Sequence, residues 1–477
     1  MTVKGRKNSA RYTKSVEHIS QPQPKGMNRR TLLSGLAGSA ISLSAMSPAA
    51  AQDNGQWYKS IFSQTSADDG VNQKSAPKQP TSLDDLRTGP VPLRSDEMLL
   101  RIDKAILHYR KLIAQGGWRI EGRIKLLRPD DDDPAIPAIR KRLILSGDIP
   151  PRGAGQYTNS YHFDEWLEFG VKNFQKRHGL RISGKLDRPT RAQIAVPPEA
   201  RLRQLMLNRK RIAKHLENGQ LNRYILVNAA GFQLEAVEQF EVKRRHRVIV
   251  GKRDRQTPEI GATIKGLNFF PYWRVPDSVA NLDLIPRLIK EPEYLQKEHI
   301  RAVKEFYGGP EIDTANVDWR TADVKKIKFR QDPGPWNALG LVRINMPNRE
   351  IVYLHDTPMK SLFKQRHRAF SAGCVRVEDV FDLVAWIARY EPVLGEAGAV
   401  QQLVDQADLE QVSVKRPSDF DVTLTRPLPV VFTYITAWVE DDGTVAFRPD
   451  IYGRDGASEL VGEHDPDAPL PPNLLSP

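Results

Sequence analysis

The chain has 477 residues, 40% hydrophobic and 27% charged, the composition of a soluble globular protein that is too long for one ordinary core. Its formal net charge is +13, yet no arginine-rich or aromatic-interleaved run favours nucleic-acid binding. Its single cysteine excludes an intrachain disulfide, so we expect two or three domains without such a bridge.

The N-terminal segment 1–51 is typical of a signal peptide. Its first 30 residues carry eight Lys or Arg and one Glu, and the short Gly-, Ala- and Ser-rich stretch that follows ends in three alanines before Gln52. This stretch is too short for a lasting transmembrane helix. The pair Arg29-Arg30 resembles a twin-arginine export signal, with an ordinary secretory peptide as the alternative. Either route predicts export, and we expect a periplasmic protein. Removal of segment 1–51 would lower its formal net charge from +13 to +6.

Residues 52–97 are rich in Ser, Gln, Asp, Pro and Lys and predict a flexible linker. Helical patterning begins at Met98, where apolar residues recur at spacings of three and four, and a helical region is expected over 98–200. The four consecutive aspartates 130–133 lack the alternating spacing of a calcium loop, so a solvated turn is expected there.

A small module is expected within this helical region. In "EWLEFGVKNFQKRHGLRISGKLDRPTRAQIAVP", Leu167, Val171 and Phe174 form one helical stripe, Gly179 ends it, and Asp187 can open a second helix. The pattern resembles the small three-helix peptidoglycan-binding domain, with "DPAIPAIRKRLILSGDI" as its first helix. Without that resemblance, the stripe indicates only a helical bundle.

After a charged helix over 198–218, the period of the hydrophobic pattern changes to two, which predicts antiparallel strands. We expect one domain over 201–455, interrupted by a helix-rich insertion at 276–328. A last hairpin turns at Asp442, and a flexible tail is expected at 456–477.

The single cysteine, Cys374, lies in "SAGCVRV", nineteen residues after His355 of "HDTP". A nucleophilic thiol needs a nearby base, a lowered pKa and backbone donors for the developing oxyanion. A helix expected from Glu378 supplies a positive field, and Gly373 lets the backbone fold closely. His355, at the end of a predicted strand, is the candidate base.

Three alternatives stay open for these residues. Cys374 can be a buried apolar residue, as free cysteines often are. It can bind zinc together with two histidines, although the spacings match no common zinc pattern. His367 is a rival base seven residues away, although in "KQRHRAF" it lies among cations and is expected to be an exposed loop residue.

The motifs "HDTP" and "SAGCVRV" resemble the active-site signature of the L,D-transpeptidases, cysteine enzymes that form 3→3 cross-links in peptidoglycan. The segments "VGKRDRQTPEI", "FFPYWRVPDSVANLDLIPRLIKEPEYL", "FRQDPGPWNALG" and "TAWVEDDGTVAFRPDIYGRD" resemble the large branch of the family, which carries a lid, so the resemblance covers about residues 98–455. Many members have a histidine directly before the Gly-Cys pair, where this chain has Ala372. His355 is therefore the only motif histidine.

The resemblance implies an α+β fold, in which a mostly antiparallel β catalytic domain with an inserted helical lid follows a small helical peptidoglycan-binding domain. It implies that Cys374 is the nucleophile, His355 its base, Gly373 part of the oxyanion turn and Arg376 a supporting residue. It also implies four pocket-lining residues: Tyr353, Ser371, Asn337 and Trp273. Structural roles are the alternatives, because Arg376 can pair with an acid, Tyr353 can be strand core and Trp273 can anchor the insertion.

The implied reaction acts on tetrapeptide stems, releases D-alanine and requires no metal or organic cofactor. Sensitivity to carbapenem β-lactams and a role in cell-wall biogenesis and cell shape are implied as well. A cysteine hydrolase of the L,D-carboxypeptidase type, attachment of an outer-membrane protein or a D-amino acid to peptidoglycan, and a non-catalytic wall-binding protein are the alternatives. The intact His355, Gly373 and Cys374 argue against the last one.

Overall fold

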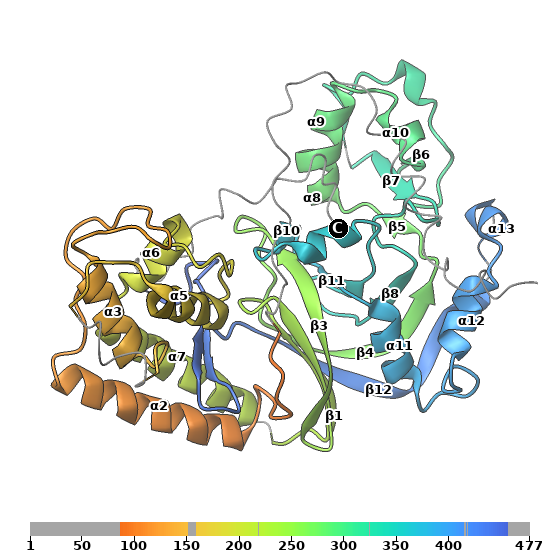
Figure 1. Cartoon of the computed structure of the whole chain (residues 1–477). Coiled ribbons are helices and arrows are strands. Elements are labelled where there is room, and N and C mark those ends of the chain that lie inside the picture. Colours follow the sequence, from red (N-terminus) through yellow and green to blue (C-terminus); the bar gives the residue numbers. More distant parts are fainter. Residues whose placement is uncertain are drawn as a thin grey trace, which may run out of the picture. The chain divides into compact units, whose positions relative to one another are not determined.

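The computed structural model describes residues 86–456 except 151–158, 218, 324, 415 and 417. Figure 1 shows the arrangement of its helices and strands. The predicted signal peptide 1–51, most of the predicted linker 52–97 and nearly all of the predicted tail 456–477 lie outside the described residues.

The described part of the helical region contains α2 (Asp96–Ala114), α3 (Ile136–Leu145), α5 (Glu165–Arg177), α6 (Arg188–Ile194) and α7 (Pro198–Leu216). Asp164 and Asp187 cap α5 and α6, since their side chains accept from the amides of Leu167 and Thr190. The predicted stripe of α5 packs with α3 and α6 in one hydrophobic cluster that includes Leu167, Val171 and Phe174. The helical bundle is thus confirmed, whereas its identity as a binding domain stays a prediction.

The predicted linker is wrong at its C-terminal end. Within this segment, the Leu93 side chain is completely buried. Arg87 explains this, because its guanidinium donates to the Glu235 carboxylate at 2.8 Å and both side chains are fully buried. The composition of the segment did not reveal this pairing, since the partner lies 148 residues away.

A nine-stranded sheet forms the centre of the β-rich domain, in the order β10-β3-β11-β9-β8-β4-β12-β1-β2. The strands are β1 (Arg223–Asn228), β2 (Gln233–Glu238), β3 (Glu241–Gly251), β4 (Gly261–Phe269), β8 (Val342–Asn345), β9 (Leu354–His355), β10 (Ala369–Ser371), β11 (Val375–Val377) and β12 (Asp421–Thr433). The long strand β3 also pairs with β2, so the sheet closes on itself. Most neighbours are antiparallel, while β1–β12, β9–β11 and β3–β10 are parallel.

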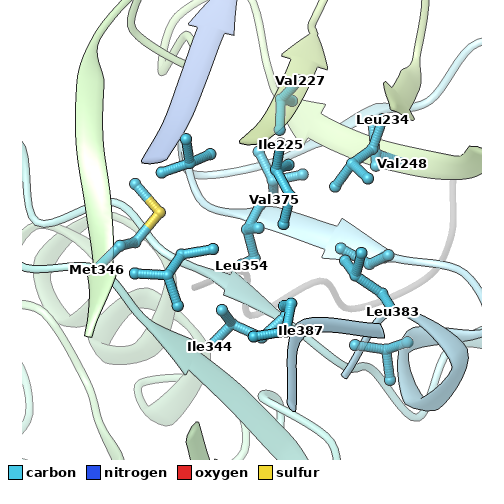
Figure 2. Packing of buried hydrophobic residues seen from close by; sticks show 14 of the residues in the cluster. Ile225, Val227, Leu234, Val248, Ile344, Met346, Leu354, Val375, Leu383 and Ile387 are labelled. Atoms are coloured by element: carbon cyan, nitrogen blue, oxygen red, sulfur yellow. The ribbon is translucent and has the colours of Figure 1, made fainter. Parts of the chain in front are cut away.

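The enclosed core combines aliphatic and aromatic side chains and includes α11 (Val380–Ala388), which follows β11 directly. Leu354 of β9 and Val375 of β11 lie in this core near Leu383 and Ile387 of α11 (Figure 2). Because successive strand residues point to opposite faces, their neighbours along β9 and β11 point out of the core. This alternation positions the candidate site.

The remaining elements flank the sheet. They are the hairpin β13 (Ala437–Val439) and β14 (Val445–Phe447), the helices α12 (Ala399–Asp405) and α13 (Leu409–Val414), and the 3₁₀ turns η4 (Lys360–Lys364) and η5 (Ser418–Phe420). The hairpin turns at Asp442 as expected and packs against α2 and α7 in a second hydrophobic cluster.

The insertion has its own small core. Its elements are α8 (Asp277–Val279), the π-helix η2 (Ala280–Leu284), α9 (Ile285–Leu288), α10 (Tyr294–Lys297), β6 (Ile300–Lys304) and the 3₁₀ turn η3 (Thr314–Asn316). It adjoins the small sheet β5 (Trp273–Arg274), β7 (Ile327–Gln331) and β6. Its hydrophobic cluster reaches the β-rich domain, because Tyr353 and Ala372 pack against it.

Candidate active site

The sheet register brings the two predicted catalytic residues onto one face. Strands β9 and β11 are parallel neighbours in which Leu354 pairs with Val375 and His355 pairs with Arg376. Leu354 and Val375 point into the core, so His355 and Arg376 share the opposite face with Cys374, two residues before Arg376. Cys374 and His355 are thus diagonal neighbours on adjacent strands, a separation that long and aromatic side chains can bridge.

The turn around Cys374 is fixed by polar contacts from two elements. Ser371 Oγ donates to the Cys374 carbonyl oxygen at 2.5 Å and accepts from the Gly373 amide at 3.2 Å. Thr257 Oγ1 donates to the Gly373 carbonyl oxygen at 2.8 Å. Gly373 has a φ of 124°, which side-chain-bearing residues rarely adopt. Ser371 and Gly373 therefore hold the backbone of the turn. Sequence analysis missed Thr257, although it lies in the quoted segment "RDRQTPEI".

The resting thiol is neutral, which corrects the expectation of a lowered pKa. Burial raises the pKa of Cys374 to about 11, while hydrogen bonds from Tyr353 and the charge of Arg376 oppose that rise. The thiol is 7% exposed. The expected helix does not help, because the strand β11 lies between Cys374 and the start of α11, and a helix dipole acts only near its first turn.

His355 is suited to accept a proton through Nε2. Its Nδ1 donates to the Asp356 carbonyl oxygen at 2.5 Å, which fixes the tautomer with an unprotonated Nε2. Nε2 makes no hydrogen bond of regular geometry among the described residues, although the Leu339 backbone lies close enough to the ring to raise its pKa slightly. Burial, and then the charge of Arg376, hold the pKa of His355 well below its usual value, so the ring is neutral at pH 7.

Arg376 is a buried cation whose nitrogens find no partner. The side chain is 1% exposed, and none of its three nitrogens has a hydrogen-bond partner in the described part of the chain. Burial lowers the pKa of Arg376 to about 10, and a negative charge on Cys374 would oppose that shift. The predicted alternative, a pair with an acid such as Asp379, is not seen.

Tyr353 completes the face as a neighbour of both catalytic candidates. Its ring lies edge-on to His355 with a centroid distance of 5.7 Å, and it hydrogen-bonds with Cys374. Arg343, a residue that sequence analysis missed, stacks over the other side of the Tyr353 ring at 5.6 Å. The alternation of "LVRINM" was the available signal, since it placed Arg343 on the same face of β8.

Two of the predicted pocket residues have structural contacts instead. The Asn337 amide is fully buried, donates to the carbonyl oxygens of Pro271 and Asp332, and accepts from the Leu339 amide. Trp273 is buried in the core of the insertion, as its structural alternative anticipated. Neither side chain has a recorded contact with Cys374.

Of the three alternatives, the burial of Cys374 is seen, whereas His367 as the base and a zinc site gain no support. His367 is half-buried and lies edge-on between Phe232 and Phe370, so it is not the exposed loop residue that was expected. In the part of the chain that the structure describes, no group of three His, Cys, Asp or Glu side chains is arranged to hold a metal ion. No described helix is long and apolar enough to span a membrane.

The β-rich domain places a buried cysteine and a histidine of fixed tautomer on one sheet face, an arrangement typical of a cysteine–histidine acyl-transfer site. Residues 222–394, which include both side chains, match the family model of the L,D-transpeptidase catalytic domain. A curated protein of Haemophilus influenzae, provisionally described as an L,D-transpeptidase, is 33% identical over 254 residues. The aligned part is 53% of this chain and 48% of that protein, so the chain spans about half the length of its relative. This part of the chain is therefore similar to L,D-transpeptidase catalytic domains.

Two solved structures share partial similarity. One is an L,D-transpeptidase from Xylanimonas cellulosilytica, with 12% identity, 66% of this chain and 100% of that chain covered, and a TM-score of 0.19. The other is a fused Zn-dependent amidase/peptidase/peptidoglycan-binding domain-containing protein from Clostridium acetobutylicum, with 10% identity, 31% and 72% covered, and a TM-score of 0.13. At these TM-scores neither comparison contributes to the argument.

Proposed function

We propose that the protein is a peptidoglycan L,D-transpeptidase that forms 3→3 cross-links through an acyl-enzyme on Cys374. The observation that carries this proposal is the register of β9 and β11, which puts Cys374, His355 and Arg376 on one sheet face. The match of residues 222–394 to the catalytic-domain family supports the reaction class. The geometry supports the residue roles.

In the first step, His355 Nε2 takes the thiol proton while Cys374 Sγ attacks the carbonyl carbon of the third stem residue. His355 then donates that proton to the departing amine of D-alanine, and a thioester remains. In the second step, an amine of an acceptor stem attacks the thioester and loses a proton to His355. The proton returns to Sγ as the new amide forms, so atoms and charge balance over the cycle.

The protonation states suit this sequence. Both partners are neutral at rest, because burial raises the pKa of Cys374 and lowers that of His355. The proton therefore moves as the substrate binds and the sulfur attacks, rather than before. Negative charge then develops on the sulfur and the carbonyl oxygen beside Arg376, which has no other partner among the described residues.

We also propose that the insertion 276–328 is a lid over the site. Its hydrophobic cluster contacts Tyr353 and Ala372, which flank the catalytic pair. Asp283 of η2 accepts two hydrogen bonds from Arg255, at 2.5 and 3.0 Å, and so ties the insertion to the loop between β3 and β4. A closed lid excludes water from the thioester and favours an amine acceptor over hydrolysis.

The test is to incubate residues 52–477 with disaccharide tetrapeptide and to identify the products by mass. A dimer that lacks one D-alanine supports the proposal, a tripeptide indicates a hydrolase, and no change indicates a non-catalytic protein. Cys374→Ala and His355→Ala should each abolish D-alanine release and remain folded. Turnover by a folded Cys374→Ala protein would exclude the mechanism.

The remaining features of the proposal concern place and partners. The sequence of segment 1–51 supports export to the periplasm, where peptidoglycan lies. The helical cluster of α3, α5 and α6 would bind the polymer there. An outer-membrane protein amine or a free D-amino acid as acceptor would appear in the same mass experiment as a different adduct.

A further inference from the structure

A large cavity lies away from the catalytic face, between the helical region and the C-terminal hairpin. Its volume is about 1090 Å³. One face of α2, the C-terminal end of α5, the turn after α3 and the hairpin β13–β14 line it. The cavity is therefore shared by segments more than 300 residues apart in the sequence, and no catalytic candidate contributes to it.

The inner wall of the cavity is rigid. Arg177 of α5 forms two hydrogen bonds with the Asp148 carboxylate, at 2.6 and 2.7 Å, and both side chains are buried. The same guanidinium donates to the Val445 carbonyl oxygen of the hairpin at 3.1 Å. This contact joins α5, the turn after α3 and β14, so the wall is formed before any ligand arrives.

The opening of the cavity carries opposite charges on its two sides. On α2, Lys104 is exposed and has no ion pair or hydrogen bond within the described residues. On the hairpin, the exposed Asp442 uses one carboxylate oxygen to accept from the Thr444 amide at 2.8 Å. Both charges therefore remain able to bind a ligand.

The protein behind the inner wall has an excess of positive charge. Arg142 and Arg201 are each 1% exposed, and Nε of both and Nη1 of Arg142 have no hydrogen-bond partner in the described residues. Burial, and then the charges of neighbouring arginines, lower the pKa of each to about 9. Asp148, which already pairs with Arg177, is the nearby carboxylate that acts on Arg142. Arg142 and Arg201 do not line the cavity, but their positive charges behind its inner wall favour a negative group inside it.

We propose that this cavity binds a peptide that carries both a free carboxylate and a free amino group. The carboxylate would lie toward Lys104 and the inner wall, and the ammonium toward Asp442. The stem peptides of peptidoglycan have these groups, so this identification rests on the proposed function. The cavity would hold one stem of the polymer while another reacts at Cys374.

The experiment measures peptide binding by calorimetry on the Cys374→Ala protein, so that no turnover interferes. The probe is a synthetic tetrapeptide stem with a free diaminopimelate amino group. Lys104→Gln removes the charge from α2, and Asp442→Asn removes the charge from the hairpin but keeps an oxygen for the Thr444 amide. Lys111→Gln, at an exposed position on the same helix outside the cavity, is the matched control.

We expect Lys104→Gln and Asp442→Asn each to weaken binding by about fivefold and Lys111→Gln to leave it unchanged. Acetylating the amino group of the probe should weaken binding to the parent protein similarly and to Asp442→Asn no further, because both changes remove one contact. Equal affinities for all variants would overturn the proposal. The proposal would also be overturned if an uncharged N-acetylglucosamine tetramer bound instead of the peptide, with the same affinity for the parent protein and for Lys104→Gln. If the peptide binds at this cavity but the parent protein with Cys374 intact shows no turnover, the proposed function is refuted and the cavity site is not.

Discussion

We predict that removing the buried charge of Arg376 increases the stability of the protein and decreases its activity. Burial lowers the pKa of Arg376 from 12.5 to about 10, which corresponds to a cost of about 3 kcal/mol for holding the charge inside the protein. None of its nitrogens recovers that cost through a hydrogen bond within the described residues. The substitution Arg376→Met keeps the length and apolar contacts of the side chain and removes the charge. We expect it to raise the free energy of unfolding by about 1–3 kcal/mol.

The same substitution should slow the chemistry of Cys374. The two residues are two positions apart on one strand face, a separation of ~7 Å, at which a unit charge contributes about 2 kcal/mol with an effective dielectric constant of ~20. Alkylation by iodoacetamide at pH 8 requires only the thiolate, so its rate should fall by about 30-fold. D-alanine release should fall less, by about tenfold, because the charge also lowers the pKa of His355 and its loss strengthens that base.

Arg368 provides the matched control. It is as deeply buried as Arg376, but its guanidinium donates to the carbonyl oxygens of Val248, Gln365 and Phe232. Arg368→Met leaves these oxygens unsatisfied and should destabilise the fold by several kcal/mol. Denaturant unfolding measures both variants. If Arg376→Met is less stable than the parent by more than about 1 kcal/mol, the guanidinium has a structural role and the electrostatic argument is wrong.

Three further predictions concern the site and its surroundings. A carbapenem should add once, at Cys374, in intact-mass spectra, and an adduct that persists in Cys374→Ser would indicate another nucleophile. Asp283→Asn should loosen the insertion and increase alkylation of Cys374, whereas Glu311→Gln, which alters an exposed pair in the same insertion, should not; equal rates would exclude Asp283 as a lid contact. Stability should fall as the pH decreases below about 6.5, because the folded-state pKa values of His355 and His178 are lowered and only the unfolded chain takes up their protons. Each ring contributes about 1.4 kcal/mol per pH unit, and His178→Gln should reduce the measured slope by one proton, so an unchanged slope would refute the assignment.

Local patterns in the sequence predicted local structure well. The stripe of Leu167, Val171 and Phe174 is buried along one side of α5, and Asp187 caps α6 as its position before Pro189 suggested. The turn at Asp442 joins β13 to β14. These features depend on spacing and on short-range hydrogen bonds, which a single sequence displays directly.

Features that depend on distant partners were predicted poorly. Arg87 was assigned to a flexible linker because its partner, Glu235, lies far along the chain. Arg142 and Arg201 gave no sign of burial, since arginine is usually exposed, and their stacking on aromatic rings exists only in the folded protein. Asn337 was expected in the pocket, but the backbone groups that surround it could not be inferred from "WNALG".

For the candidate site, the motifs predicted which residues lie together on one face but not their electrostatics. Cys374, His355 and Arg376 were identified from the motifs, and the sheet register places them on one face. The lowered thiol pKa was inferred from a helix start at Glu378, whereas "VRV" forms a strand and carries the cysteine away from that helix. Strand alternation was the better guide, because it puts Val375 and Val377 on one face of β11 and Arg376 on the other.

The cost of the resting site is itself an argument about function. Cys374, His355 and Arg376 are all buried. Burial raises the pKa of Cys374 and lowers those of His355 and Arg376, so it favours the neutral form of each group. A fold selected only for stability would satisfy such groups, as it does for Arg368. We propose that the cost is recovered when negative charge develops on the sulfur and the carbonyl oxygen during attack, since a buried cation then gains a partner in a low-dielectric site. On this proposal, Arg376 is complementary to the transition state rather than to the resting thiol, which is the condition for faster chemistry.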